Sequence, residues 1–78
     1  MGEITIRQPH SETVFTGLVE ALRAPGPAVR IAAGRALADL GDTRGIAELE
    51  RAIGVEQEQV VRLRLEDDLK TLRTKGRQ

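Results

Sequence analysis

The sequence contains no cysteine, no tryptophan and no tyrosine, and Phe15 is its only aromatic residue. The absence of cysteine excludes a disulfide framework and a thiolate metal site. A single aromatic side chain provides no platform on which nucleic-acid bases stack. The twelve basic residues equal the twelve acidic ones in number, so no net charge attracts a polyanion or an anionic lipid surface. We therefore predict that the chain does not bind nucleic acid.

Long apolar segments are also missing. No apolar run approaches the ~18 residues of a membrane span, and no basic stretch followed by an apolar one resembles a secretory leader. The 78 residues suffice for one domain at most. The hydrophobic fraction of 40% and the charged fraction of 31% are typical of a folded globular chain. We expect no membrane partner and a cytoplasmic location.

Residues with catalytic or metal-binding chemistry are few and scattered. His10 is the only histidine, whereas a metal site needs several convergent ligands and a catalytic dyad needs a positioned partner. The acids of Glu66–Asp68 are consecutive, so on a helix they point about 100° apart. Asp68 falls among apolar positions, and we expect it at the edge of the core beside an arginine such as Arg64. Gly41–Gly45 resembles a phosphate loop only in its glycines. The sequence predicts no catalytic residue, no metal and no cofactor.

An internal repeat is the main positive feature of the sequence. The Ala-rich stretch Pro27–Leu40 recurs, altered in detail, as Gln59–Leu72. Six positions match at a shift of 32: Val29, Arg30, Ile31, Ala33, Leu37 and Leu40 correspond to Val61, Arg62, Leu63, Leu65, Leu69 and Leu72. Four earlier positions match at a shift of 31: Phe15, Leu18, Ala21 and Leu22 correspond to Ile46, Leu49, Ala52 and Ile53. A repeat of this period with short helices is typical of a helical solenoid.

Start and stop signals divide the chain into helices. Ser11 is suited to cap a first helix, because its hydroxyl accepts from the free amides of the next turn. Pro27 suits the first position of a second helix, where its missing N–H costs nothing. Gly41 is expected to end that helix, Asp42 to cap the third and Gly54 to stop it. We predict four helices, over about 12–23, 27–40, 43–53 and 56–73.

The repeated motif also resembles a known family. It reads Pro27-x-Val29-Arg30-x-x-Ala33-x-x-Ala36-Leu37-x-x-Leu40-Gly41-Asp42 and resembles the second helix and following turn of HEAT-like repeats, specifically the short type named after phycobilisome lyases. The resemblance covers Thr13–Leu72. It implies an all-α fold of two antiparallel helical hairpins, stacked as a short HEAT-like α-solenoid of four helices. Such repeats often carry an aspartate in the turn before Val-Arg. Here that turn reads Ala24-Pro25-Gly26 in the first unit and contains Glu56 and Glu58 in the second.

We divide the chain into three parts on this basis. Residues 1–11 form an extended N-terminal arm, in which Ile4 and Ile6 alternate with polar residues and Pro9 opposes a helix at the preceding residue. Residues 12–75 form the two-unit HEAT-like repeat domain. Residues 76–78 form a frayed C-terminus.

The ends of so short a stack are predicted to leave apolar residues uncovered. Ile31 and Leu63 occupy equivalent positions away from the main apolar stripe, and the second unit is expected to cover Ile31 only. Because solenoid repeats seldom stand in pairs, we predict an interaction face comprising Val60, Leu63, Val14 and Ala21. The second helices would add a polar rim of Arg30, Arg35, Arg62 and Arg64.

These features predict a non-catalytic protein–protein interaction or assembly module. The expected partner is a protein, either a second copy in a homo-oligomer or a larger chain of which this is a domain. Two alternatives follow from resemblance alone. Similar helical pairs form the C-terminal region of some gluzincin zinc aminopeptidases, although the His-Glu-x-x-His segment is absent here. The family name also suggests a bilin lyase-like or phycobiliprotein-associated protein.

Overall fold

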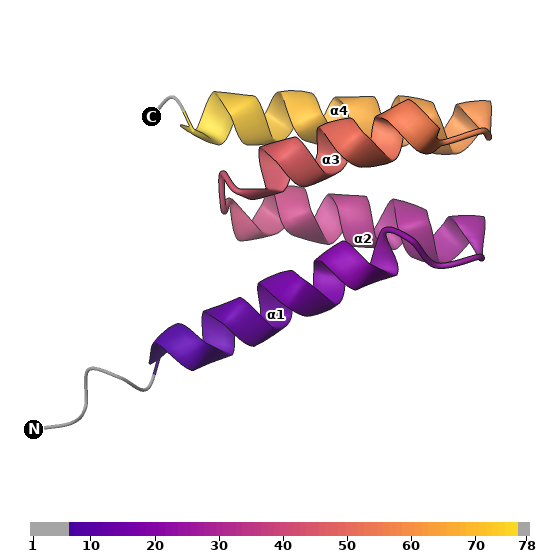
Figure 1. Cartoon of the computed structure of the whole chain (residues 1–78). Helices are drawn as coiled ribbons and strands as arrows, with labels where there is room; N and C mark the ends of the chain where they lie inside the picture. Colours follow the sequence, from indigo (N-terminus) through magenta and orange to yellow (C-terminus); the bar gives the residue numbers. More distant parts are fainter. Residues whose placement is uncertain (1–6, 77–78) are drawn as a thin grey trace, which may run out of the picture.

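Two helical hairpins lie side by side in the computed structural model, which describes residues 7–76, with side chains from residue 12 onward (Figure 1). The first hairpin pairs α1 (Arg7–Ala21) with α2 (Pro27–Leu40), and the second pairs α3 (Gly45–Val55) with α4 (Gln59–Gly76). Helix α2 packs against both α1 and α4, whereas α1 slants away and meets α3 only slightly. This arrangement confirms the predicted all-α fold of two stacked hairpins.

Helix α1 begins earlier than the sequence predicts. It starts at Arg7, so Ser11 lies within the helix and is not its N-cap. The extended conformation expected for residues 1–11 is therefore wrong from Arg7 onward, while Ile4 and Ile6 lie outside the described residues. Pro9 is the third residue of the helix. A proline is tolerated there because the first amides of a helix have no carbonyl partner four residues back.

Helix α2 has the predicted ends. Pro27 is its first residue, and Gly41 follows its last residue with a positive φ of 75°. In this left-handed conformation the Gly41 amide donates to the carbonyl oxygen of Leu37 at 3.2 Å. Glycine adopts the conformation without the steric penalty that a side chain brings.

The boundaries of α3 and α4 lie two to three residues later than expected. Asp42 does organise the turn before α3, because its Oδ1 accepts from the Arg44 amide at 3.0 Å and its carbonyl accepts from the Gly45 amide at 2.8 Å. It therefore shapes an entry turn and does not cap the first turn of the helix directly. Gly54 does not stop α3, which continues to Val55. The helix ends where Glu56 takes an extended conformation.

The core lies between the two hairpins. Its fully buried side chains come from α2, α3 and α4 and are Leu37, Leu49, Leu65, Leu72 and Val61. Gly34 of α2 allows α4 to approach closely. A Cβ built there would lie 2.5 Å from Leu65 Cδ2 and 2.8 Å from Asp68 Oδ2. As predicted, Ile31 packs against this core.

Candidate interaction surface

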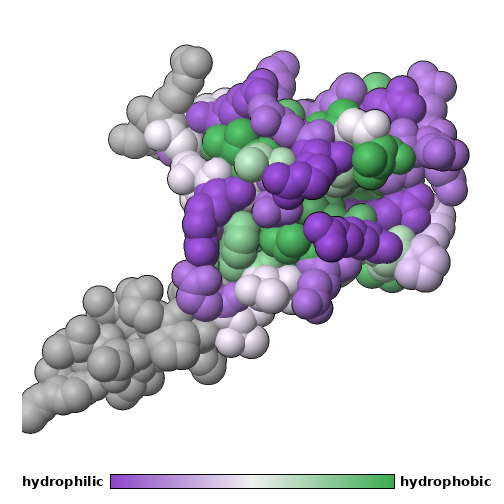
Figure 2. Space-filling view, in the orientation of Figure 1, coloured by the Kyte–Doolittle hydropathy of each residue, from purple (hydrophilic) through white to green (hydrophobic). Residues whose placement is uncertain are grey.

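Apolar side chains remain exposed at the outer end of the stack. Val60 is 62% exposed and Leu63 is 55% exposed on α4. We call the outer side of α4 that contains these two residues the α4 end face. On the side viewed in Figure 2, apolar side chains lie interspersed among charged ones. The position of the end face at the last helix, and not its size, distinguishes it from ordinary scattered surface residues.

The repeat explains which residues are covered and which are not. Ile31 of α2 packs against the core, whereas its equivalent 32 residues later, Leu63, is exposed. At the other end the relation is reversed: Val61 is 1% exposed, and its equivalent Val29 is 49% exposed. Leu63 and Val29, each exposed at one end, thus have covered counterparts at the junction of the two units. This is the pattern expected of the outermost units in a solenoid stack.

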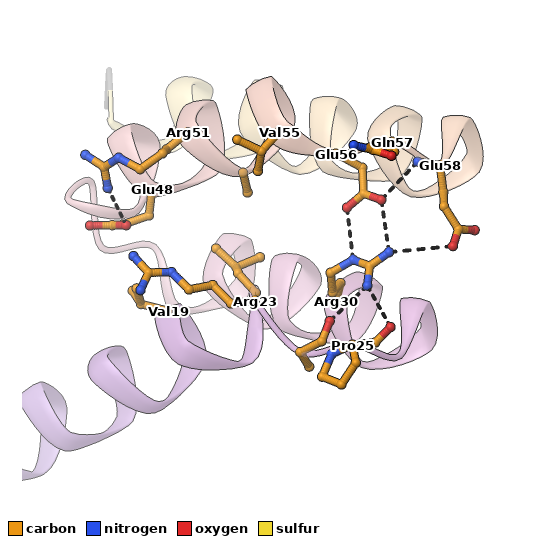
Figure 3. A pocket seen from close by; sticks show the side chains of 13 residues that line it. Val19, Arg23, Pro25, Arg30, Glu48, Arg51, Val55, Glu56, Gln57 and Glu58 are labelled. Atoms are coloured by element: carbon orange, nitrogen blue, oxygen red, sulfur yellow. Dashed lines mark hydrogen bonds and ion pairs between the residues drawn. The ribbon is translucent and has the colours of Figure 1, made fainter.

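A charged clamp joins the turns of the two units (Figure 3). Arg30 donates from Nε to Oε1 of Glu56 at 2.9 Å and from Nη2 to Oε2 at 3.0 Å. Its Nη1 donates to the carbonyl oxygens of Ala24 and Pro25, at 2.9 and 3.0 Å. Glu58 lies 3.8 Å from the same guanidinium group. One arginine thus ties the α1–α2 turn to the α3–α4 turn through a bidentate pair, the strongest geometry for this kind of contact.

The clamp changes the titration of Glu56. This carboxylate is buried, and the hydrogen bonds from Arg30 hold its pKa below the ordinary value, with a smaller contribution from the Glu58 amide. Burial acts in the opposite direction but is outweighed. Glu56 is therefore charged at neutral pH, as the pairing requires.

Arg62 repeats only half of this arrangement. Its Nη2 donates to the carbonyl oxygen of Glu56 at 2.9 Å, six residues back, as Arg30 donates to that of Ala24. Within the described part of the chain, no carboxylate pairs with Arg62 as Glu56 pairs with Arg30. Each arginine therefore closes its own turn, but only Arg30 is joined to a following unit.

Asp68 is buried between α2 and α4, at 8% exposure. Burial raises its pKa to about 6, and the nearby charge of Asp67 acts in the same direction. Arg35 and Arg64 lower the pKa but do not restore its usual range. The carboxylate thus lies deeper than the core edge at which the sequence places it, because glycine at position 34 leaves it room.

A groove of about 690 Å³ lies between α1 and α3 (Figure 3). Val19, Leu22 and Ala52 supply apolar lining. Two carboxylates in the groove are paired: Glu56 with Arg30, and Glu48 with Arg51 at 2.9 Å. The groove is lined by no serine, threonine, cysteine, histidine or lysine. Among the described residues, no cluster of acids, histidines or cysteines is arranged to hold a metal ion.

A model of the family described as HEAT repeats matches residues 4–70. The chain belongs to the HEAT-repeat family. Its two repeats are the α1–α2 and α3–α4 hairpins. Searches of curated proteins and of solved structures each gave no significant match. In the part of this HEAT-repeat chain that the structure describes, no helix has the length and apolar character of a membrane span.

The HEAT-repeat fold does not bring all the predicted interaction residues together. Val60 and Leu63 share the outer side of α4, and Val14 is exposed on α1 at the opposite end. Ala21 packs against the core and is partly buried, so its expected place on an exposed face is wrong. The sequence analysis missed Val55, the most exposed large apolar residue described, at the end of α3.

The four arginines expected as a polar rim divide into two pairs. Arg30 and Arg62 are partly buried and hold the turns of the HEAT repeats. Arg35 and Arg64 are exposed, and Arg35 pairs with Asp39 on the same helix at 3.4 Å. The equivalent positions of Arg30 and Arg62 in the repeat could have indicated that both have the same role. The sequence does not specify which nearby acid each arginine would contact.

Proposed function

We propose that this HEAT-repeat chain is a non-catalytic protein-interaction module that binds a partner protein through the α4 end face. HEAT repeats are units of protein-interaction and scaffold modules. The observation that carries the proposal is the contrast between Leu63, which is exposed, and Ile31, its covered equivalent. A helical hairpin packed on α4, as the second unit packs on α2, would cover Leu63 in the same way.

Burial energies support such docking. Covering a side chain the size of valine or leucine stabilises a complex by about 1.5–3 kcal/mol, and the α4 end face offers two, Val60 and Leu63. A stable interface also needs roughly 1,200–2,000 Å² of total buried surface, which a whole packed hairpin supplies more readily than a short peptide. Within the HEAT family, the opening motif of α2 supports membership of the short type named after phycobilisome lyases.

The test uses the tagged chain in an extract of the cells that naturally express it. Size-exclusion chromatography should find the wild type in a complex larger than the monomer. Leu63→Asp should elute as the monomer with an unchanged far-UV circular dichroism spectrum, because a charge cannot be buried at an apolar contact without large cost. Ala47→Asp is the matched control, since Ala47 and its equivalent Thr16 are both exposed. A wild type that elutes alone, or a Leu63→Asp variant that elutes with the wild type, refutes the proposal.

A further inference from the structure

We infer that the α4 end face binds a helical hairpin of a different protein, whose turn before its second helix presents a carboxylate to Arg62. This inference rests on the proposed function and specifies the chemistry of the partner. Its basis is the unequal use of two equivalent arginines. Arg30 holds its own turn and also the carboxylate of Glu56 in the next unit. Arg62 holds its own turn in the same way.

The missing contact defines where the partner's acid must lie. A hairpin stacked on α4 as the second unit stacks on the first would bring its own turn beside Arg62. A carboxylate at the position of Glu56 would then complete the clamp. The guanidinium group already has one donor fixed on the Glu56 carbonyl oxygen at 2.9 Å, so little side-chain freedom would be lost on binding.

A second copy of this chain stacked head to tail does not supply that acid. Its incoming turn would be the one before α2, where Ala24 and Gly26 stand in place of Glu56 and Glu58. Neither residue carries a carboxylate, so Arg62 would be covered without an ionic partner. Burying a charged group in that way is costly.

The rest of the α4 end face also favours a partner of different sequence. The junction between the two units places Gly34 and Ala38 of α2 in buried positions. Their equivalents on α4, 32 residues later, are Glu66 and Lys70, which are exposed. A partner hairpin must therefore supply groups that pair with these charges. Leu65 and Asp68 are the residues that meet Gly34 at the junction, and a second copy stacked head to tail would bring their equivalents Ala33 and Ala36. Both are apolar, so this stacking would leave the charges of α4 unpaired.

Zero-length crosslinking tests this directly. In the complex isolated through the tagged chain, the Arg62→Lys variant keeps the positive charge and places an amine that a carbodiimide joins to a carboxylate in contact. We expect a crosslink from position 62 to an acidic residue of another protein, in a turn between two helices, and absent from the free variant. Arg62→Gln should lower the fraction of chain in the complex about tenfold or more, as for loss of one partner of a charged pair. Arg51→Gln, at a 61% exposed arginine of α3, should leave that fraction unchanged.

Three results would overturn the inference. The first is an Arg62→Lys complex that forms without a crosslink at position 62 beyond those of the free chain. The second is a crosslink to a second copy of this chain, and the third is an Arg62→Gln variant that binds as well as the wild type. If Leu63→Asp still disrupts the complex in these cases, the proposed function stands and only the chemistry of the partner is wrong. If Leu63→Asp has no effect, the proposed function itself fails.

Discussion

The ion pair between Arg30 and Glu56 should contribute a large share of the stability of this chain. Glu56→Gln keeps the shape of the side chain and removes its charge. Breaking a buried pair by changing one partner costs about 3–5 kcal/mol. Arg30 is 16% exposed and keeps its two carbonyl contacts, so we expect the lower cost of about 2–3 kcal/mol. A chain of this length has a total stability of about 4–12 kcal/mol.

Thermal and urea denaturation followed by far-UV circular dichroism measures this cost, since the chain has no tryptophan or tyrosine to report by fluorescence. A loss of this size lowers Tm by about 10–20 °C in so small a domain. Glu58→Gln is the matched control, because Glu58 is 59% exposed and 3.8 Å from Arg30. It should cost less than about 0.5 kcal/mol.

The effect of Glu56→Gln should also depend on pH. Folding lowers the pKa of Glu56 below its usual 4.5, so the unfolded chain takes up the proton first as the pH falls. The stabilisation is therefore complete well above pH 4.5 and is lost as the pH drops through the folded pKa. The gap between the wild type and Glu56→Gln should close on acidification. Equal stability of the two at pH 7, or an equal loss in Glu58→Gln, would refute the role assigned to the clamp.

Two further changes test the junction of α2 and α4. Asp68→Asn should stabilise the chain at pH 7 by about 1–2 kcal/mol, a figure reduced for partial solvent access. Burial raises the pKa of Asp68 from 3.8 to about 6, so the wild type should lose stability relative to this variant as the pH rises from 4 to 6. Urea midpoints of the two proteins that stay a constant distance apart over that range would contradict this. Gly34→Ala should lower stability by about 1–2 kcal/mol, because the clash with buried Leu65 outweighs the gain in helix propensity. Gly54→Ala is the control, because a Cβ added at Gly54 meets no atom within 4 Å, and it should raise the stability by up to about 1 kcal/mol. A gain in stability in both Gly34→Ala and Gly54→Ala would show that α2 and α4 can move apart.

The sequence predicted the parts of the fold that depend on local signals and on repetition. Pro27 and Gly41 fix the ends of α2 through their own backbone preferences, and the 32-residue shift revealed the second unit. The start of α1 was mistaken because Pro9 was read as a helix breaker, although in a first turn it breaks no hydrogen bond. Gly54 does not stop α3, which continues to Val55, because a single glycine costs a helix only about 1 kcal/mol relative to alanine.

The candidate site was less predictable because it depends on distant contacts. Arg30 and Glu56 are 26 residues apart, and which acid meets the arginine is decided only when the turns stack. Asp68 was recognised as out of place, but its depth follows from the close approach at Gly34. The exposure of Leu63, in contrast, could be predicted from the repeat, since among the described helices α4 packs only on α2 and α3 and leaves its outer side bare.

Hydroxyl-radical footprinting of Leu63 tests the central claim most directly. The purified chain and the native complex isolated through it are labelled in parallel, and oxidation at each residue is measured by mass spectrometry. Leu63 is exposed in the free chain and should be labelled there but protected in the complex. Val29, exposed on α2 at the opposite end, should react equally in both samples. Equal labelling of Leu63 in the two samples would contradict the assignment of the α4 end face as the docking surface.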